Sequence, residues 1–271
     1  IYSYSSSSIK HIIGCSFENK VAQNGGAIYI VDPMTNTIIR DSNFTSNTAR
    51  NHAGAVYVPS GSTNVDFNNC RFNGNGASGS GGAIYVDTGS SGTDVIGSAF
   101  TSNQASASGG AVYAYDLNVQ GSSFDNNAAV NGGGAVYCSA DDAGIHSSNF
   151  TNNRATSSKD GYGGAVYIIG DDSIVDTSRF DDNSASVYGG ALAIKGSGGD
   201  VAFCEFNRNS AQQSGGAIYV EGNATVRDSE FTGNTGKNYG GAIYWNGNGA
   251  NIIRSNFTSN QINNNLGGGA I

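Results

Sequence analysis

Three pairs of adjacent aspartates are the residues of this sequence whose type and spacing best fit acid–base chemistry. They are Asp141–Asp142, Asp171–Asp172 and Asp181–Asp182. Hydrolysis of a glycosidic bond needs two carboxyl groups at a defined separation on one face of the protein. These aspartates stand among small and polar residues, where a carboxylate commonly hydrogen-bonds the nearby backbone of a turn. We therefore expect no catalytic site. A polysaccharide-active enzyme and a loose calcium site in these turns remain alternatives.

The cysteines and histidines give little support to metal or redox chemistry. Cys15, Cys70 and Cys204 each stand two residues before a recurring phenylalanine, and Cys138 lies in another segment of its repeat. The three histidines are dispersed, at positions 11, 52 and 146. A structural zinc site needs four ligands grouped at short spacings. We predict no metal site, no cofactor, and free thiols that are buried.

The charge balance limits the kinds of partner. The chain has 21 acidic and 13 basic residues, a net charge of -8 at pH 7. An acidic surface is unsuited to nucleic acid or anionic lipid. No apolar run reaches about 18 residues, the length that a membrane-spanning helix needs. We expect no nucleic acid as partner and no membrane span within this segment.

Two phrases recur along the whole chain and decide the fold class. The phrase Gly-Gly-Ala-(Ile/Val)-Tyr places alanine at positions 27, 55, 83, 111, 135, 165, 191, 217, 242 and 270. Between these alanines, Phe-x-x-Asn places phenylalanine at positions 17, 44, 72, 100, 124, 150, 180, 206, 231 and 257. A period of 24 to 30 residues indicates a solenoid. Short alternating segments rich in Val, Ile, Tyr and Phe, separated by Gly, Asn and Asp, indicate strands and turns.

We therefore predict an all-β protein, a single right-handed parallel β-helix of about ten coils with three short strands each. Residues 1–271 form one such segment, which we expect to be part of a longer chain. No coil can bury its own apolar face, so stability comes from stacking of neighbouring coils.

The repeats also predict which side chains face the core. Residues two apart share one face of a strand, so the aliphatic residues on either side of each tyrosine point inward and the tyrosine points outward. The residue five before each phenylalanine is apolar in every coil, and the residue two before it is always Ser or Cys. These two positions are three residues apart, so on a straight strand they would point to opposite faces. We therefore predict a bend between them, at residues such as Gly14, Asp41 and Asn69.

Two polar features have structural explanations. The second glycine of the doublet is present in all ten coils, whereas Ala53 once replaces the first. A backbone with positive φ, or a close approach between coils, would require this glycine. Asparagine stands three residues after phenylalanine in nine coils, with Lys20 as the exception. We interpret these asparagines as a ladder that hydrogen-bonds the coils above and below.

The recurring tyrosines are the main candidates for binding. They are Tyr29, Tyr57, Tyr85, Tyr113, Tyr137, Tyr167, Tyr219 and Tyr244, interrupted at Ala193. If they point outward, they form a flat aromatic stripe suited to a glycan or a neighbouring rod. Self-stacking of the tyrosines across strands is the structural alternative. An insertion at Thr156–Tyr162 is a further candidate for a binding loop.

Four N-x-Thr sequons begin at Asn43, Asn149, Asn223 and Asn256. Three of them stand directly before an inward phenylalanine, so their asparagines should point to solvent. They are candidate glycosylation sites.

The paired phrases, such as Gly25-Gly26-Ala27-Ile28 with Phe44-x-x-Asn47, resemble the repeats of chlamydial polymorphic outer-membrane proteins. They are also similar to the large adhesin-like surface proteins of methanogenic archaea. The resemblance covers essentially the whole chain. It implies a β-helical passenger or stalk displayed at the cell surface and acting in adhesion.

Three functions of different class follow. We favour a non-enzymatic, extracellular or cell-surface stalk that adheres to a glycan or another cell. The first alternative is a subunit of an extracellular filament, with neighbouring rods as partners and self-association through the ends of the β-helix. The second is the polysaccharide-active enzyme considered above.

Overall fold

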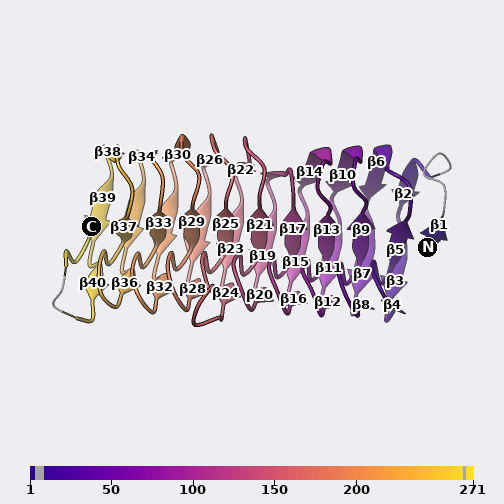
Figure 1. The fold of residues 1–271 in the computed structure, drawn as a ribbon, viewed down its shortest axis with the longest axis horizontal. Coiled ribbons are helices and arrows are strands. Elements are labelled where there is room, and N and C mark those ends of the chain that lie inside the picture. Colours follow the sequence, from indigo (N-terminus) through magenta and orange to yellow (C-terminus); the bar gives the residue numbers. More distant parts are fainter. Residues whose placement is uncertain (4–8, 265–266) are drawn as a thin grey trace.

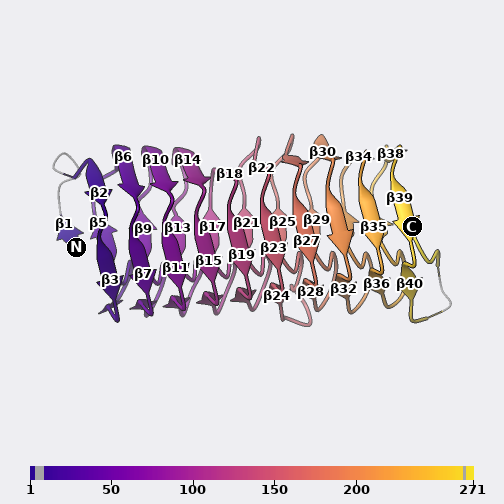
Figure 2. The same cartoon turned by 180° about the vertical axis from the view of Figure 1, so that it is seen from behind.

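The computed structural model describes residues 1–3, 9–264 and 267–271. These residues contain forty strands and no helix. The strands form four parallel sheets, each with ten strands, that run side by side along an elongated rod (Figures 1 and 2). The chain visits the four sheets in turn in every coil, so the prediction of an all-β parallel β-helix of about ten coils is confirmed.

The expectation of three strands per coil was wrong, because each coil has four. We name the sheets A to D in the order in which one coil visits them after the Gly-Gly-Ala phrase. The fourth strand, in sheet D, is only two residues long and often reads as Thr-Ala, Gln-Ala or Ser-Ala. So short a segment shows no alternation of large apolar residues, and the sequence pattern therefore gave no sign of it.

The bounds of the strands are as follows. Sheet A contains β1 (Tyr2–Ser3), β5 (Ile28–Ile30), β9 (Val56–Val58), β13 (Ile84–Val86), β17 (Val112–Ala114), β21 (Val136–Cys138), β25 (Val166–Ile168), β29 (Leu192–Ile194), β33 (Ile218–Val220) and β37 (Ile243–Trp245). Sheet B contains β2 (His11–Ile13), β6 (Thr35–Arg40), β10 (Thr63–Asn68), β14 (Ser91–Ile96), β18 (Asn118–Gln120), β22 (Gly144–His146), β26 (Ile174–Asp176), β30 (Gly199–Ala202), β34 (Ala224–Arg227) and β38 (Asn251–Ile253). Sheet C contains β3 (Ser16–Glu18), β7 (Asn43–Thr45), β11 (Arg71–Asn73), β15 (Ala99–Thr101), β19 (Ser123–Asp125), β23 (Asn149–Thr151), β27 (Arg179–Asp181), β31 (Glu205–Asn207), β35 (Glu230–Thr232) and β39 (Asn256–Thr258). Sheet D contains β4 (Val21–Ala22), β8 (Thr48–Ala49), β12 (Gly76–Ala77), β16 (Gln104–Ala105), β20 (Ala128–Ala129), β24 (Arg154–Ala155), β28 (Ser184–Ala185), β32 (Ser210–Ala211), β36 (Thr235–Gly236) and β40 (Gln261–Ile262).

The recurrent phenylalanines form a stacked column through the core, as predicted. Each is the middle residue of a sheet C strand and pairs in register with the phenylalanine of the next coil, as Phe100 does with Phe124. The centroids of these two rings lie 4.7 Å apart and the rings are almost parallel, at 3°. All but the terminal Phe17 and Phe257 are completely buried. The apolar residues five positions before each phenylalanine, on sheet B, are buried as well, except for the partly buried Ile252.

Asparagine side chains form a second buried column, and this prediction is also confirmed. The Nδ2 of Asn127 donates to the Oδ1 of Asn153 in the next coil at 3.0 Å and to the carbonyl oxygen of Phe100 at 3.0 Å. The backbone N–H of Asn127 also donates to the Asn153 Oδ1, at 2.9 Å. The left-handed backbone conformation that asparagine tolerates lies one residue earlier, for example at Asn126 with φ of 54°. The ladder asparagines are therefore selected for their amide hydrogen bonds.

The two glycines of the doublet have different tasks. The first adopts positive φ, as Gly133 does at 68°, and Ala53 occupies the same conformation at 62°. The second lies against the next coil: a Cβ on Gly134 would stand 1.9 Å from the carbonyl oxygen of Gly164. Of the two explanations considered, close approach therefore applies to the second glycine and positive φ to the first.

The corner before each phenylalanine follows the prediction. The predicted bend residues Gly14, Asp41 and Asn69 have φ values between 52° and 62°. The Ser or Cys two before phenylalanine points inward, and the hydroxyl of Ser122 accepts the backbone N–H of Ser98 at 3.1 Å. All four cysteines are free, and three of them are buried.

Removal of one ring from the phenylalanine column tests this account of the core. Phe124→Ala should lower the free energy of unfolding by about 3–5 kcal/mol, because it leaves a cavity between two coils that cannot collapse. Ser123→Ala, on the exposed face of the same strand, should change it by no more than about 0.5 kcal/mol. Urea unfolding followed by circular dichroism measures both. Equal stability of the two variants would contradict the inward assignment.

Candidate functional site

The sheet A strands hold the recurring tyrosines on the outer face of the rod. In most of the three-residue strands the first and third residues are buried and the tyrosine between them is partly exposed, as in Ile84–Val86. Tyr85 pairs in register with Tyr57 on one side and Tyr113 on the other. We call the eight recurring tyrosines the tyrosine ladder. One of them departs from the expected outward position, because Tyr219 is only 4% exposed.

The ladder rings from Tyr57 to Tyr137 stack upon one another, whereas Tyr29 meets Tyr57 edge-on at 64°. The ring centroids of Tyr85 and Tyr113 lie 4.8 Å apart, and the two rings are 4° from parallel. For Tyr113 and Tyr137 the centroid distance is 4.6 Å and the interplanar angle is 7°. Stacked rings cover each other's faces, so this part of the ladder offers ring edges and hydroxyls to a partner. The expected flat aromatic stripe was therefore wrong in its geometry, and self-stacking occurs.

A second column of tyrosines covers the ladder in the C-terminal half. Tyr162, Tyr188 and Tyr239 each stand directly before a glycine doublet and are joined through parallel bridges that include Ser214. Tyr188 stacks on Tyr219 with centroids 4.8 Å apart, which explains why Tyr219 is buried. This column does not stand out in the sequence, because the position directly before the doublet holds other residue types in the other coils. The residues at that position are Asn24, His52, Ser80, Ser108, Gly132 and Gly267.

The break in the ladder at Ala193 is filled from this second column. Ala193 is fully buried although it has no ring of its own. The Tyr162 ring lies 5.5 Å from the Tyr167 ring in its own coil and 5.9 Å from the Tyr219 ring two coils further along. Tyr162 therefore bridges the two ladder residues that Ala193 separates.

The ladder changes its ring orientation just before this break. Tyr167 stands at 84° to Tyr137, with centroids 5.5 Å apart. Its ring lies over Gly132, where an added Cβ would be 2.1 Å from the Tyr167 Cδ1. Beside these rings lies a pocket of about 320 Å³, whose lining includes Tyr162 and Glu221. The pocket thus forms where the parallel stack ends.

Burial raises the pKa of the hydroxyls of Tyr57, Tyr85, Tyr113, Tyr137, Tyr167 and Tyr219. Desolvation is the main cause for Tyr85 and Tyr137, whose pKa rises to about 12, with further contributions from nearby acidic and tyrosine side chains. The pKa of Tyr57 is also raised, first by burial and then by Asp87, whose carboxylate accepts a 2.6 Å hydrogen bond from the Tyr57 hydroxyl. These hydroxyls are therefore uncharged at neutral pH and act as a row of hydrogen-bonding groups.

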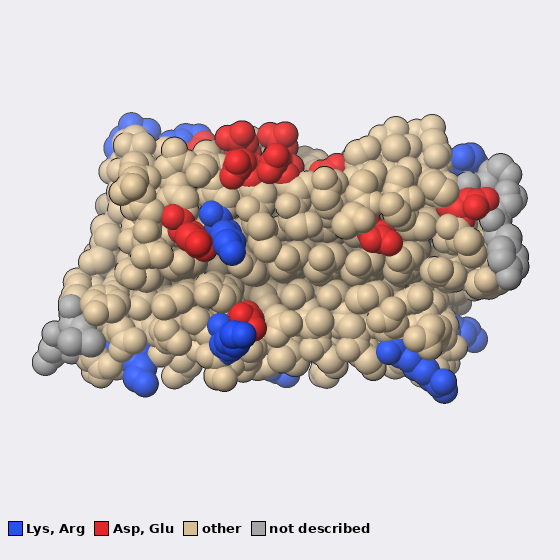
Figure 3. Space-filling model, viewed as in Figure 1, with Lys and Arg blue, Asp and Glu red and all other residues tan. Residues whose placement is uncertain are grey.

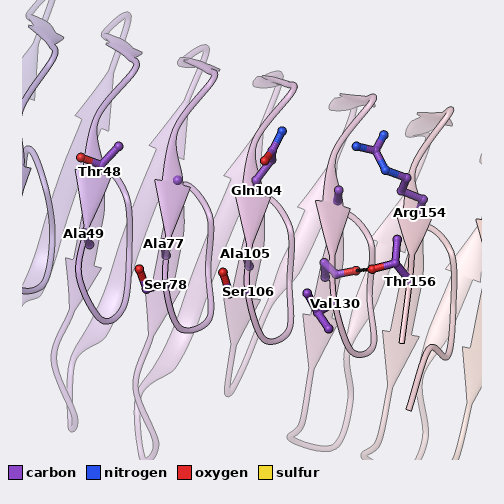
Figure 4. A pocket seen from close by; sticks show the side chains of 13 residues that line it. Thr48, Ala49, Ala77, Ser78, Gln104, Ala105, Ser106, Val130, Arg154 and Thr156 are labelled. Atoms are coloured by element: carbon purple, nitrogen blue, oxygen red, sulfur yellow. Dashed lines mark hydrogen bonds between the residues drawn. The ribbon is translucent and has the colours of Figure 1, made fainter. Parts of the chain in front are cut away.

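A trough of about 430 Å³ runs across the outer face of sheet D (Figure 4). Its floor consists of small side chains such as Ala77 and Ala105, and Arg154 stands at one end. The Thr156 hydroxyl hydrogen-bonds the carbonyl oxygen of Ala129 at 3.4 Å. The trough exists because the outward residues of β12 and β20 are Gly76 and Ala128.

The aspartate pairs accept backbone hydrogen bonds in turns or form ion pairs on the surface. The Asp141 carboxylate accepts the backbone N–H of Asp171 at 2.8 Å, and the Asp171 carboxylate accepts that of Ser197 at 2.7 Å. Asp181 and Asp182 instead form ion pairs with arginines, and Arg208 reaches Asp182 at 2.8 Å. Figure 3 shows acidic side chains gathered along the edge of the rod that carries the turns into sheet B. Within residues 1–3, 9–264 and 267–271, no group of three or more His, Cys, Asp or Glu side chains could hold a metal ion.

A protein-family model matches the chain in six separate segments, each lying within one repeat. The model described as Chlamydia polymorphic membrane protein repeat matches residues 69–87, 97–115, 121–139, 147–169, 203–221 and 228–244. The chain carries Chlamydia polymorphic membrane protein repeats. Each matched repeat begins at the bend before phenylalanine and ends at the residue just after the tyrosine strand, except the last, which ends at Tyr244 within β37. The coil that contains Ala193 lies between the matched repeats. No curated protein and no solved structure matches the chain.

These repeats suggest a surface or outer-membrane protein of the adhesin or autotransporter-passenger type. The part of the chain that the structure describes has no helix that is both long and apolar enough to span a membrane. All four sequon asparagines, Asn43, Asn149, Asn223 and Asn256, are exposed, as expected for the three that directly precede a phenylalanine. Glycosylation at them stays a prediction.

The raised pKa of the ladder predicts a loss of stability in alkali. The folded-state pKa of Tyr85 and Tyr137, about 12, lies above the ordinary value of 10.0. Below pH 10 the neutral ladder contributes its full stabilisation, and this contribution is lost as pH rises through the folded pKa. We expect the melting temperature to fall between pH 10 and pH 12, and to fall less in Tyr137→Phe, which keeps the ring. Tyrosinate absorbance that titrates at the ordinary pKa in the folded protein would contradict this.

Proposed function

We propose that this rod is a non-enzymatic, surface-displayed passenger or stalk that adheres to a glycan or to another cell through its tyrosine face. The observation that carries the proposal is the tyrosine ladder itself. From Tyr29 to Tyr167 it presents one type of side chain at a fixed spacing of one coil. A row of hydroxyls on a rigid surface allows several weak contacts to act together.

Three observations support a role without catalysis. The carboxylates of Asp141 and Asp171 are engaged by backbone N–H groups of neighbouring coils. The aspartates at 181 and 182 are neutralised by arginines. The resemblance to adhesin or autotransporter passengers comes from the repeats that hold the ladder.

Filament formation is the second candidate, favoured by the ends of the rod. In the described residues, the outermost strands of sheets B, C and D are β2 to β4 on one side and β38 to β40 on the other. Such edges have unpaired backbone groups that pair readily with a further strand. That strand belongs to another coil of the same polypeptide or to a second rod.

The test removes ladder rings outside the pocket. Tyr57→Ser, Tyr85→Ser and Tyr113→Ser, combined in one variant, should reduce binding of the labelled chain to cells by roughly tenfold or more, because several contacts are lost together. Asn73→Ser, Thr101→Ser and Asp125→Ser, combined on the outer face of sheet C, should leave binding unchanged. Flow cytometry on cells with and without glycosidase treatment measures both, and circular dichroism confirms that each variant is folded.

Other outcomes would overturn the proposal. Binding that survives loss of the three rings would exclude the tyrosine face. Wild-type chain that binds no cell type but forms long fibres in negative-stain images would support the filament. Release of reducing or unsaturated sugar ends from a polysaccharide would establish the enzyme.

A further inference from the structure

The pocket where the tyrosine stack ends combines aromatic and charged side chains. Its aromatic part consists of Tyr137, Tyr162 and Tyr167, and its charged part of Asp160, Lys195 and Glu221. We propose that this pocket binds one neutral pyranose ring of a glycan. The proposal rests on the adhesive function proposed above and adds to the row of hydroxyls one site, built by several neighbouring coils, that holds a single sugar ring.

Two local features of the chain create the pocket. The insertion before the sixth doublet folds into a tight turn, in which the Gly161 N–H donates to the Ser157 carbonyl oxygen at 3.0 Å. This turn places Asp160 and Tyr162 at the rim. The second feature is Gly132, whose missing side chain leaves room for the Tyr167 ring.

The ring orientations at the end of the parallel stack supply an aromatic contact for a ligand. In the stack, Tyr137 has one face covered by Tyr113 at an angle of 7°. On its other side Tyr167 is perpendicular, at 84°. A perpendicular neighbour covers a ring only with its edge, so part of the Tyr137 face beside Tyr167 stays uncovered. The C–H face of a pyranose is apolar and packs against such a surface.

The polar groups complement the rim of a sugar. Two carboxylates, one ammonium group and the Asn131 amide border the same pocket. Together they offer both hydrogen-bond donors and acceptors, which ring hydroxyls need. The volume of about 320 Å³ lies at the small end of ligand pockets, as suits a single ring.

The charges favour a neutral ligand over an anionic one. Asp160 and Glu221 outnumber Lys195, so the pocket carries a net negative charge. The pKa of Tyr162 is raised first by burial and then by Tyr188, Glu221 and Asp160, as a negative potential requires. A sialic acid carboxylate would be repelled here.

The experiment is saturation-transfer NMR on the whole chain, with the methyl pyranosides of glucose, galactose, mannose and N-acetylglucosamine as probes. We expect transfer from the protein to the ring protons of at least one of them. Glu221→Ala and Gly132→Ala should each weaken that binding by about fivefold or more, because the first removes an acceptor and the second displaces the Tyr167 ring. The matched controls are Glu230→Ala, on the exposed face of sheet C, and Gly76→Ala, where a Cβ meets nothing nearer than 3.9 Å.

Several outcomes would overturn the inference. These are no transfer to any neutral pyranoside, equal binding by the pocket variants and their controls, or binding of N-acetylneuraminic acid or choline alone. Circular dichroism and melting temperature show whether the variants are folded. If wild-type chain binds cells but no pyranoside, this inference fails while the adhesive function stands. If it binds a pyranoside but no cells, the adhesive function fails while the pocket stands.

Discussion

The stacking of the rod depends on a close contact between neighbouring coils at the second glycine of the doublet. At Gly134 the Cα faces the carbonyl oxygen of Gly164 in the next coil, and the space that a Cβ would fill is already occupied. The same contact recurs from coil to coil, as at Gly110 and Gly190. Any side chain at this position would push two coils apart. Strand pairing at the spacing of a parallel sheet then fails locally in sheets A and D, which meet at this corner.

In-register stacking turns each repeated residue into a column. The phenylalanine column fills the core and the asparagine column satisfies buried polar groups, so one geometry provides both burial and hydrogen bonding. The same in-register pairing of strands aligns the tyrosines into the ladder on the outer face of sheet A. Stability and surface display are thus coupled, because any change in coil spacing would disturb all three columns together.

Much of this arrangement could be predicted because the sequence repeats ten times. Side chains such as Phe124 and Val119 occupy equivalent places in every coil, so their inward orientation follows from parity alone. The fourth strand could not be predicted, because two residues such as Thr48–Ala49 show no periodicity. The ring positions of Tyr162 and Tyr167 could not be predicted from the sequence either. They depend on the contacts of the Tyr162 ring with tyrosines of two different coils, on the space beside Gly132 and on a turn found in a single coil.

The most direct measurement compares the free energies of unfolding of two glycine variants. Gly134→Ala places a methyl group against the Gly164 carbonyl and should cost about 3 kcal/mol or more. Gly121→Asn changes a glycine with φ of 57° and open space around its Cα, where asparagine tolerates the same conformation, and should cost less than about 1 kcal/mol. If Gly134→Ala proves as stable as Gly121→Asn, close glycine contact does not set the stacking of the coils.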